Sequence, residues 1–516
     1  MTSSLPPIII AVYQLGFGGA THAVFDEARL FSELGHRTII ATFNNDPGFE
    51  ESVEAYRRLG RISTKVEVRN LHWDTQHQGR RFGKISRRKS SIARRWHSLP
   101  AWGAARSTVT EGPLRVVRTF SKAGHLTKVQ KFNGSGTLVE LQRISRDGVL
   151  TLDWNQPAYC YYRTRRNLGD AHAFSEQYFA NDRFCYMSRT IDPRTGYGSG
   201  VDVFRRRSRT AQHFHGIPAW QTYWLQSLVD EVGGHPIVIG EAPSIIPKIV
   251  RLRPDSAVRI AKLHNNHNEI PYLPGSDLRS DHAEIFAVLE KFDAVVVLTE
   301  GQRNDIIERH NAQANIVVIP NVLWPRESLG IERDPDLVGI VSRIAPQKAI
   351  ADAVEAFRLV LQARPTARLR IWGRGSDQGK IRDLIAKYNL GANIEMMGRT
   401  EDPDHALQSC SFTVSTSLTE SFSLAIAESS LNGTPVVSYD CPFGPRSLIQ
   451  DQVTGVLVER GDVTGLAAQI VSLLDDPERA RNMGAAAQDY VSRIVDPAVV
   501  VPKWERLFSK LAARHP

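Results

Sequence analysis

Hydrophobic residues along the first 75 positions alternate between short strand-like runs and a helical repeat. Residues 7–13 are mostly apolar, and a glycine-rich turn follows at 16–19. Apolar residues then recur at helical spacing up to Gly35, and residues 38–41 form the next apolar run. An order of strand, helix and strand is typical of a parallel α/β sheet. We therefore predict the first part of a Rossmann-like domain over residues 1–75.

The pattern changes between residues 76 and 210. A basic stretch comes first, and short alternating runs follow from about residue 114, separated by Asn133-Gly134 and Asp147-Gly148. Dipeptides of this kind between alternating runs are the strongest short-range signal for a β-hairpin. Residues 76–210 are therefore predicted to be a basic loop and an antiparallel β-rich insertion in the N-terminal domain.

Strand and helix patterns alternate again after the insertion. Residues 211–325 are predicted to complete the N-terminal domain, 326–490 to form a second Rossmann-like domain, and 491–516 to add a C-terminal helix. The predicted fold class is α/β, with two Rossmann-like domains facing across a cleft. Because open parallel sheets bind ligands beyond the carboxyl ends of their strands, this cleft is the expected site.

The distribution of charge adds one feature to this picture. Lys and Arg number 64 against 55 Asp and Glu, a net charge of +9, and no acidic residue occurs between Asp74 and Glu111. The cations of residues 80–106, interleaved with aromatic side chains, favour an anionic polymer or a membrane surface as partner. A solvated basic loop is an equally good interpretation. No nucleic-acid-binding module is recognisable, so a nucleic-acid role is not expected.

The apolar runs and the cysteines indicate where in the cell the protein is expected. The longest apolar runs are strand-sized, far below the roughly 20 residues that a membrane-spanning helix needs. The N-terminus lacks the pattern of a signal peptide, so we expect a cytoplasmic protein, with residues 80–106 as a potential contact to the inner face of the membrane. The cysteines are scattered and predict neither a zinc site nor a disulfide framework, but free thiols, at Cys160, Cys185, Cys410 and Cys441.

The glycine turn is the first candidate for chemistry. Gly18 and Gly19 would let the backbone approach a phosphate, and the start of the following helix favours negative charge. The turn lacks the complete G-x-G-x-x-G pattern, and the second strand does not end on an acidic residue. Both departures argue against a dinucleotide-dependent oxidoreductase.

Two cations and two carboxylates in the second domain are the next candidates. Arg343 and Lys348 follow a strand and precede a helix, where they could neutralise a diphosphate. Glu420 and Glu428 are separated by about 12 Å of helix, a distance that suits the two ends of a nucleotide sugar. Amides at a helix start could meet phosphate oxygens between them, at Ser421, Phe422 and Ser423. Surface charges and an ordinary amphipathic helix are the alternatives.

Two histidines follow a predicted strand of the first domain. His264 or His267 could act as an acid, a base or a hydrogen-bond donor to a sugar. Histidines three residues apart could also bind a metal, but no third ligand and no Asp-x-Asp motif is evident, so no metal is predicted. A purely structural histidine is the alternative for at least one of the two.

Together these patterns resemble the family 4 retaining glycosyltransferases of GT-B fold. The likeness rests on the glycine turn, on Arg343 with Lys348, and on the spacing of Glu420 and Glu428. Further matches are Ile319-Pro320-Asn321 and Gly373-Arg374-Gly375. Within this family, residues 438–462 and the β-rich insertion resemble the wall teichoic acid (poly(polyol-phosphate)) alpha-glycosyltransferases. That group is itself similar to the enzymes that start glycosylation of serine-rich adhesins.

The resemblance implies an activity and a role for each candidate residue. It implies metal-independent, retaining transfer of glucose or N-acetylglucosamine from a UDP-sugar, a substrate rather than a cofactor, to a cell-wall polymer. Arg343 and Lys348 would stabilise the leaving diphosphate, and Glu420 and His264 would contact the donor sugar, with His267 as a second choice. Glu428 would hold the ribose. Further donor contacts are implied at Gly18, Gly19, Gly373, Met397, Gly398, Ser421, Phe422 and Ser423.

The acceptor and the assembly leave alternatives open. In relatives the inserted β domain mediates oligomerisation or acceptor binding, so a homo-oligomer is implied. The same fold could instead glycosylate protein Ser or Thr or a lipid-linked glycan. A sugar-phosphate epimerase with two Rossmann domains is disfavoured by the paired cations and paired carboxylates. A non-catalytic scaffold that binds polyanions through the basic stretch is the alternative from a different class.

Overall fold

The computed structural model describes residues 5–16, 19–77, 106–121, 125–145, 147–156, 159–206, 208, 210–310 and 315–513. Gly18 and residues 80–105 of the basic stretch lie outside these ranges. The chain divides into two compact units. The first unit comprises residues 1–41, 55–68 and 229–516, and the second unit comprises residues 42–54 and 69–228.

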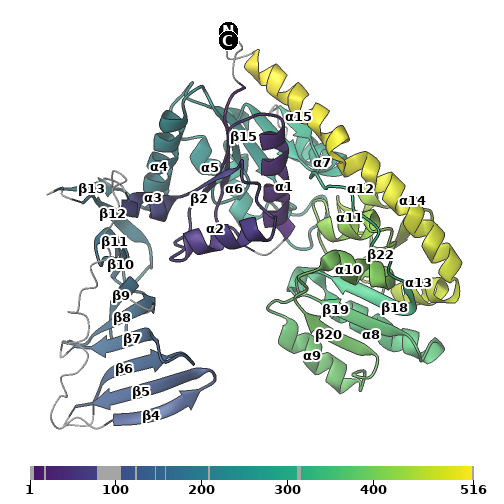
Figure 1. The fold of residues 1–516 in the computed structure, drawn as a ribbon, viewed down its shortest axis with the longest axis horizontal. Helices are drawn as coiled ribbons and strands as arrows, with labels where there is room; N and C mark the ends of the chain where they lie inside the picture. Colours follow the sequence, from purple (N-terminus) through teal and green to yellow (C-terminus); the bar gives the residue numbers. More distant parts are fainter. Residues whose placement is uncertain are drawn as a thin grey trace. The chain divides into compact units, whose positions relative to one another are not determined.

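The N-terminal sheet has seven strands (Figure 1). Its order is β17 (Ile316–Val318), β16 (Ala294–Val297), β15 (Val258–Leu263), β14 (Ile237–Gly240), β1 (Ile8–Val12), β2 (Thr38–Thr42) and β3 (Glu67–Asn70). β1 pairs in parallel with β14, and the pairs from β14 to β17 are parallel as well. Every position of β1, β14 and β16 is buried, as expected for parallel strands covered on both faces.

Several helices lie between the strands of the N-terminal sheet along the sequence. They are α1 (Gly19–Glu33), α2 (Phe49–Arg58), α3 (Leu71–His77), α4 (Ile217–Val232), α5 (Ile246–Ile249), α6 (Ser280–Phe286), the short 3₁₀ helix η2 (Leu289–Lys291) and α7 (Glu300–His310). Of these, α3 and most of α4 belong to the second unit. The last helix among the described residues, α15 (Pro497–Ala512), packs in the hydrophobic cluster around β1 and α1. Its Trp504 lies edge-on to Phe31 of α1, with 5.2 Å between ring centroids. The C-terminal helix is therefore part of the N-terminal core.

The C-terminal sheet has six parallel strands. Its order is β20 (Ile394–Gly398), β19 (Arg368–Trp372), β18 (Asp334–Val341), β21 (Cys410–Ser415), β22 (Val436–Tyr439) and β23 (Gly455–Val458). The helical segments between and after these strands are η3 (Pro346–Lys348), α8 (Ile350–Ala363), α9 (Gln378–Lys387), α10 (Pro403–Ser409), α11 (Leu424–Leu431), α12 (Pro445–Leu448), α13 (Val463–Asp475) and α14 (Pro477–Val495).

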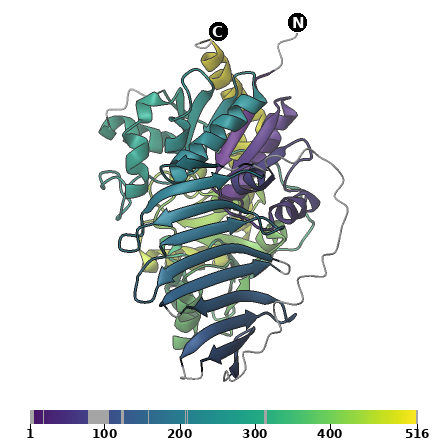
Figure 2. The ribbon, with the colours of Figure 1, turned by 90° about the vertical axis from the view of Figure 1, so that its left-hand side faces the viewer.

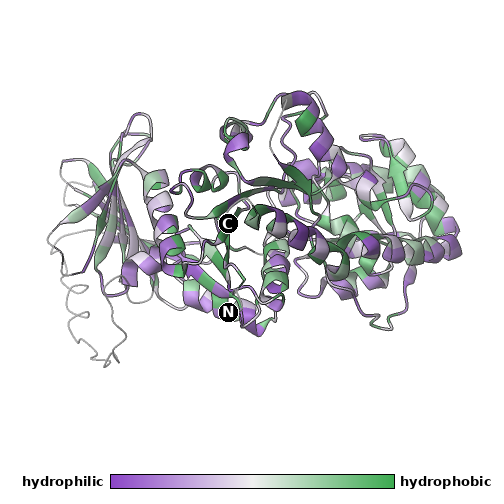
Figure 3. Ribbon diagram, turned by 90° about the horizontal axis from the view of Figure 1, so that it is seen from above, coloured by the Kyte–Doolittle hydropathy of each residue, from purple (hydrophilic) through white to green (hydrophobic). Residues whose placement is uncertain are grey.

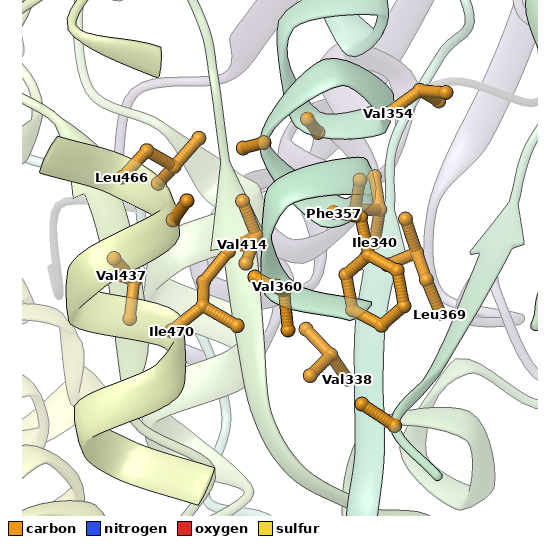
Figure 4. Close-up of a cluster of buried hydrophobic side chains, with 14 of the residues drawn as sticks. Val338, Ile340, Val354, Phe357, Val360, Leu369, Val414, Val437, Leu466 and Ile470 are labelled. Atoms are coloured by element: carbon orange, nitrogen blue, oxygen red, sulfur yellow. The ribbon is translucent and has the colours of Figure 1, made fainter. Parts of the chain in front are cut away.

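Apolar side chains from both helices and strands form a hydrophobic cluster around the C-terminal sheet. Figure 4 shows Phe357 and Val360 of α8 packed over Ile340 and Leu369, with Ile470 of α13 beside them. The hydropathy colouring in Figure 3 shows hydrophobic residues on both strands and helices. Burial of apolar area, at roughly 25 cal/mol per Å², stabilises the packing of the helices on the sheet. The loops at the edges of the sheet do not belong to this packing, and such loops commonly carry functional residues.

The insertion is one antiparallel sheet of ten strands, in which each strand pairs with the next along the chain (Figure 2). The strands are β4 (Arg106–Glu111), β5 (Leu114–Phe120), β6 (Leu126–Phe132), β7 (Leu138–Ile144), β8 (Val149–Gln156), β9 (Tyr159–Asn167), β10 (Ser175–Phe179), β11 (Cys185–Ile191), β12 (Gly198–Phe204) and β13 (Ala211–Phe214). The predicted antiparallel insertion is confirmed. It continues past the predicted end at residue 210, because β13 pairs with β12.

Two negative findings concern the described part of the chain. No helix there is both long enough and apolar enough to cross a bilayer. The cysteines are free; Cys410 and Cys441 are buried, whereas Cys160 and Cys185 are only partly buried.

Candidate functional site

Loops from the carboxyl edges of the two parallel sheets meet in the first unit. The loop after β15 contacts the loop after β21, where the Ser421 hydroxyl donates a hydrogen bond to the backbone carbonyl of His264. In the same region the Asn266 side-chain amide lies 3.0 Å from the Thr419 hydroxyl. These contacts bring His264, Glu420 and the start of α11 together from distant parts of the sequence. Carboxyl edges of parallel strands are where such folds place their ligands.

Lys348 and Glu420 form an ion pair at this meeting point. Lys348 Nζ lies 2.5 Å from Glu420 Oε1, and only 16% and 12% of the two side chains are exposed. The backbone around Lys348 is held by the Thr416 hydroxyl, which bonds the Lys348 carbonyl at 2.9 Å. The Leu418 amide bonds the Gln347 carbonyl at 2.8 Å. An ammonium fixed in this way is a preplaced positive charge of the kind that stabilises developing negative charge.

Arg343 lies in the loop between β18 and η3 with an exposed side chain. Its guanidinium makes no ion pair with the residues that the structure describes. The loop itself is tightly fixed, since the Ser342 amide bonds the Trp372 carbonyl and the Ile344 amide bonds the Arg374 carbonyl, both at 3.0 Å. The structure therefore leaves Arg343 available for an external anion, on a rigid loop.

Gly373 allows the close approach of the loops after β18 and β19. A Cβ at Gly373 would lie 1.8 Å from the Ser342 carbonyl oxygen, and its φ is +152°. The Gly373 amide bonds the carbonyl of Gly398 at 2.7 Å, which ties in the end of β20. Gly398 itself has φ +73°, and its neighbour Met397 is 41% exposed. Gly373, Met397 and Gly398 are thus adjacent at the sheet edge, as the donor-pocket hypothesis requires.

The Gly373→Ala variant should be destabilised by roughly 2–4 kcal/mol, because its Cβ would collide with backbone in a left-handed conformation. Gly379→Ala is the matched control, since no atom lies within 4 Å of the added Cβ and the position is helical. Its unfolding free energy should change by about 1 kcal/mol at most. Urea unfolding of both variants measures the difference. Equal stabilities would show that the close approach is not needed.

The starts of helices α1 and α11 lie side by side. A Cβ built on Gly19, the first residue of α1, would lie 3.0 Å from Leu424 Cδ1 at the start of α11. Ser423 precedes α11 in the left-handed conformation with φ 76°. Ser421, Phe422 and Ser423 are buried. The Phe422 ring belongs to a hydrophobic cluster. Phe422 can therefore offer a ligand only its backbone. Two helix starts together supply unpaired amides that favour an anion.

His264 is held from behind by a buried chain of charged groups. Its Nε2 lies 2.7 Å from Glu241 Oε2, and 11% of its side chain is exposed. Lys262 Nζ lies 3.5 Å from Glu241 Oε1 and also bonds Glu27, with 0–2% of these three side chains exposed. None of Glu27, Glu241 and Lys262 was among the predicted site residues. They come from α1, from the end of β14 and from β15, and no sequence spacing links them.

The buried chain separates the pKa values of its two carboxyl groups. Burial raises the pKa of Glu27 to about 8 despite the neighbouring Lys262. Burial also acts on Glu241, but Lys262 and His264 outweigh it and lower the pKa of Glu241 to about 2. Burial thus favours the neutral form of Glu27, whereas Lys262 and His264 favour the ionised form of Glu241. With Glu241 ionised, His264 donates Nε2–H to it, which leaves Nδ1 as the nitrogen that can accept a hydrogen bond.

His267 has a different environment from that of His264. Its side chain is 0% exposed, and its Nε2 lies 3.0 Å from Asp305 Oδ2. Its ring stacks on Phe286 at 5.4 Å and on Phe443 at 5.8 Å between centroids. Phe443 belongs to the loop that pairs with Glu420. His267 thus packs the loops of the two sheets together and presents no surface to a ligand in this structure.

Glu428 lies in the middle of α11, and its charge interacts with a second carboxyl group, that of Asp26. Burial raises the pKa of Glu428 to about 7, while Arg326 lowers it and Asp26 of α1 raises it further. Burial likewise raises the pKa of Asp26 to about 6, opposed by Arg326 and Arg61. Asp26 and Arg326 were not predicted, because they come from the middle of α1 and from the segment before β18.

These raised pKa values make stability depend on pH. A carboxyl whose pKa rises from 4.5 to about 7 on folding adds stability that is complete below about 4.5 and is lost as pH rises through about 7. The unfolding free energy of the parent protein should fall over this range. In Glu428→Gln the fall should be smaller, and the variant should gain stability over the parent at pH 8. Urea titrations at several pH values measure both curves, and parallel curves would contradict the assignment.

Metal-binding clusters are missing from the ranges that the structure describes: no group of three or more His, Cys, Asp or Glu side chains there could hold a metal ion. The groups that lie on the loops at the carboxyl edges of the two sheets include Lys348, Arg343, two helix starts, Glu420 and His264. This set suits a molecule with a negatively charged group and several hydroxyls.

Residues 293–490 match the family model described as glycosyl transferases group 1. The predicted resemblance to these glycosyltransferases is confirmed. The group 1 segment includes Arg343, Lys348, Glu420 and Glu428, whereas His264 and Glu241 lie outside it.

Two curated proteins that are similar to this chain have names that describe sugar transfer to polyol-phosphate polymers. The chain is 28% identical over 324 residues to poly(ribitol-phosphate) alpha-N-acetylglucosaminyltransferase of Staphylococcus aureus, which covers 63% of this chain and 64% of that protein. It is 33% identical over 222 residues to poly(glycerol-phosphate) alpha-glucosyltransferase of Bacillus subtilis, covering 42% of this chain and 32% of that protein. The matches thus span less than two thirds of either relative.

Solved structures that cover nearly the whole chain confirm the predicted GT-B fold. A mutant of S. aureus TarM, in complex with fondaparinux, alpha-GlcNAc-glycerol and UDP, has a TM-score of 0.79 at 22% identity, covering 98% of this chain and 100% of that one. The pneumococcal O-GlcNAc transferase GtfA, in complex with UDP and GlcNAc, has a TM-score of 0.68 at 17% identity, covering 98% and 99%. The chain therefore has the GT-B fold with parallel sheets.

Proposed function

We propose that the chain is a retaining hexosyltransferase that moves glucose or N-acetylglucosamine from a UDP-sugar to a hydroxyl of a poly(polyol-phosphate). The curated relatives carry these two activities in their names. The observation that carries the proposal is the convergence of Lys348, Glu420 and His264 beside the starts of α1 and α11. On this proposal the two parallel sheets face each other across a cleft that holds the donor.

The diphosphate is the leaving group, and its departure builds up negative charge. In the proposed arrangement Lys348 and the exposed Arg343 lie on the side of the C-terminal sheet, and amides at the start of α11 add partial positive charge. Gly19 keeps the start of α1 close to the same point. The chain's own cations thus neutralise the leaving group, and no step of this scheme calls on a metal.

The sugar is positioned by groups that are already oriented. Glu420 accepts hydrogen bonds from sugar hydroxyls with one oxygen while the other keeps Lys348 in place. His264 offers Nδ1 to the sugar, because Glu241 engages Nε2 at 2.7 Å. Glu428 holds the ribose from the first turns of α11. The acceptor hydroxyl attacks on the face that the diphosphate leaves, so no carboxylate has to form a covalent intermediate.

The acceptor is proposed to lie on one face of the ten-stranded sheet. The pairing registers place Arg106, Lys128, Arg143 and Arg165 in one cross-strand row, with Thr119, Thr151 and Ser175 at the strands between or beside them. Directly opposed residues share a face, and strands are spaced by roughly 4.8 Å. Arg106 and Arg165 are thus about 24 Å apart. We call these cations and hydroxyls the cross-strand row.

The row is crowded with positive charge and has a hollow beside it. Burial together with Arg106 and Arg143 lowers the pKa of Lys128. Asp153 pairs with Arg143 and Arg163, both at 2.6 Å, whereas Arg165 is exposed without an ion pair to the described residues. A hollow of about 550 Å³ is lined by Arg143, Thr151, Arg165 and Phe174 among others. A linear polymer with regularly spaced phosphates matches such a row.

Arg165→Gln should raise the KM for the polymer about 5-fold at low salt, which corresponds to ~1 kcal/mol for one cation near an anionic partner. Arg166→Gln is the matched control: Arg166 is also exposed, but the next residue along a strand points to the opposite face. It should leave KM unchanged. The effect of Arg165→Gln should shrink in 0.5 M salt because salt screens exposed charges. Equal KM values for both variants would place the acceptor elsewhere.

The whole proposal is tested by transfer assays with purified protein. UDP-glucose and UDP-N-acetylglucosamine are each incubated with poly(ribitol-phosphate), poly(glycerol-phosphate) or a serine-rich peptide, and sugar incorporation and UDP release are measured. The expected result is incorporation into a polyol-phosphate polymer. Incorporation into the peptide alone would favour the protein-glycosylating alternative, to which the likeness to GtfA also points. Polymer binding without turnover of any donor would favour the scaffold.

A further inference from the structure

A cluster of arginines surrounds a cavity at the other edge of the C-terminal sheet. Arg333 directly precedes β18, Gly433 comes shortly before β22, and Gln408 comes shortly before β21, so the cavity lies at the amino ends of these strands. The candidate donor residues all follow the carboxyl ends. The cavity measures about 200 Å³ and opens to solvent between α11 and α14. It is therefore separate from the donor site.

Arg333 brings an uncompensated positive charge to this cavity. Its guanidinium bonds the Asn432 carbonyl at 2.6 Å, the Cys410 carbonyl at 3.0 Å and the Thr434 hydroxyl at 2.5 Å. All of these acceptors are neutral, and no carboxylate of the described residues pairs with it. Burial lowers the pKa of Arg333, which reflects a charge that is poorly solvated. A nearby anion would stabilise it.

Two further guanidinium groups line the same cavity. Arg481 of α14 is exposed and makes no ion pair within the described ranges. Arg326 Nε lies 3.5 Å from Asp404 Oδ1, a loose contact for a charged pair. Glu327 is the one carboxylate among the described residues that line the cavity. Three planar donors around a small opening match the geometry of phosphate oxygens, which guanidinium groups bind in pairs of hydrogen bonds.

We propose that the cavity lined by Arg326, Arg333 and Arg481 is a second binding site, which takes a small phosphate-bearing anion. It stands independently of the proposed sugar transfer, because none of its residues belongs to the candidate donor site. The ligand chemistry is a phosphate group, either free inorganic phosphate or the end of a phosphomonoester. The cavity is large enough for the phosphate and a short substituent.

Arg326 connects this site with the middle of α11. Arg326 favours the charged form of Glu428, and the same guanidinium lines the cavity. An anion bound there reduces the positive field that Glu428 experiences. An anion bound in the second site should therefore weaken the stabilisation of the charged form of Glu428, the residue that the proposed function assigns to the ribose.

The test is titration calorimetry of the full chain with inorganic phosphate and, separately, with glycerol 1-phosphate. Arg481→Gln is the diagnostic variant, since its exposed, unpaired side chain can be changed without disturbing the fold. Arg493→Gln is the matched control on the same helix, outside the cavity and paired with Asp489. Arg343→Gln reports on phosphate that binds at the candidate donor site instead.

We expect saturable binding of phosphate to the parent protein. The affinity should weaken at least 5-fold in Arg481→Gln and stay unchanged in Arg493→Gln and Arg343→Gln. Stronger binding of glycerol 1-phosphate would identify a phosphomonoester as the ligand, and stronger binding of inorganic phosphate would identify the free anion. Absence of saturable binding at millimolar concentrations would overturn the proposal. So would unchanged affinity in Arg481→Gln, or a loss confined to Arg343→Gln.

Discussion

Replacing Lys348 with alanine should lower kcat for sugar transfer by about 10²–10³-fold, the usual effect of removing one preorganised charge at a developing anion. The Lys348 ammonium is held 2.5 Å from Glu420 and is largely shielded from water, and charges attract more strongly where water is excluded. The substitution also leaves Glu420 without its partner. Initial rates of UDP release and of sugar incorporation measure the effect, with UDP affinity determined in parallel.

A second lysine of the same domain supplies the control for Lys348. Lys380 in α9 is exposed and belongs to no ion pair among the described residues. Lys380→Ala should therefore retain the parent rate while changing the net charge by the same amount. If Lys348→Ala turns over donor at a rate close to that of Lys380→Ala, the ammonium has no part in the reaction, and the diphosphate must be stabilised by other groups.

Replacing Lys262 with alanine should lower the unfolding free energy by about 3–5 kcal/mol, because it removes the cation from the buried, charged Glu241 and leaves only the His264 ring as its partner. The Lys262 side chain is 0% exposed and lies between Glu27 and Glu241. Urea unfolding at pH 7 measures the loss. Because Lys262 contacts Glu241, and Glu241 in turn bonds His264, the variant should also lose sugar-transfer activity at temperatures where it is still folded.

Glu27→Gln is the matched control for this buried chain. Burial raises the pKa of Glu27 to about 8, so most of the parent protein already has a neutral carboxyl there at pH 7. Below about pH 4.5, where Glu27 is protonated in both the folded and the unfolded parent, an amide of the same shape should therefore change the free energy of unfolding by about 1 kcal/mol or less. Between about pH 4.5 and 8 the parent should lose stability relative to the variant, because Glu27 ionises there only in the unfolded state. A large loss in Glu27→Gln at pH 7 would mean that Glu27 is charged there.

Much of the fold could be read from the hydrophobic pattern. The first apolar run became β1 (Ile8–Val12), and the run at 38–41 became β2 (Thr38–Thr42), because buried parallel strands are continuous apolar segments. Turn dipeptides such as Asp147-Gly148 marked the antiparallel insertion, where Gly148 adopts φ 79° between β7 and β8. The last strand β13 (Ala211–Phe214) was missed, since it is short and has little apolar character.

The candidate site was only partly predictable. Lys348 and Glu420 follow strands at recognisable motifs, and the structure brings them into direct contact. Glu241 and Lys262 could not be predicted, because a buried charge is recognised only by the neighbours that surround it in three dimensions. His267 was indistinguishable from His264 in sequence, yet one ring is stacked inside the protein and the other is partly exposed.

The most direct measurement is a crystal structure of the chain with UDP bound. We expect the diphosphate to lie within hydrogen-bonding distance of Lys348 and of amides at Ser421–Ser423, with the ribose near Glu428. We also expect Arg343, whose side chain is exposed, to turn onto the phosphates. A diphosphate bound remote from Lys348, for instance among Arg326, Arg333 and Arg481, would contradict the account.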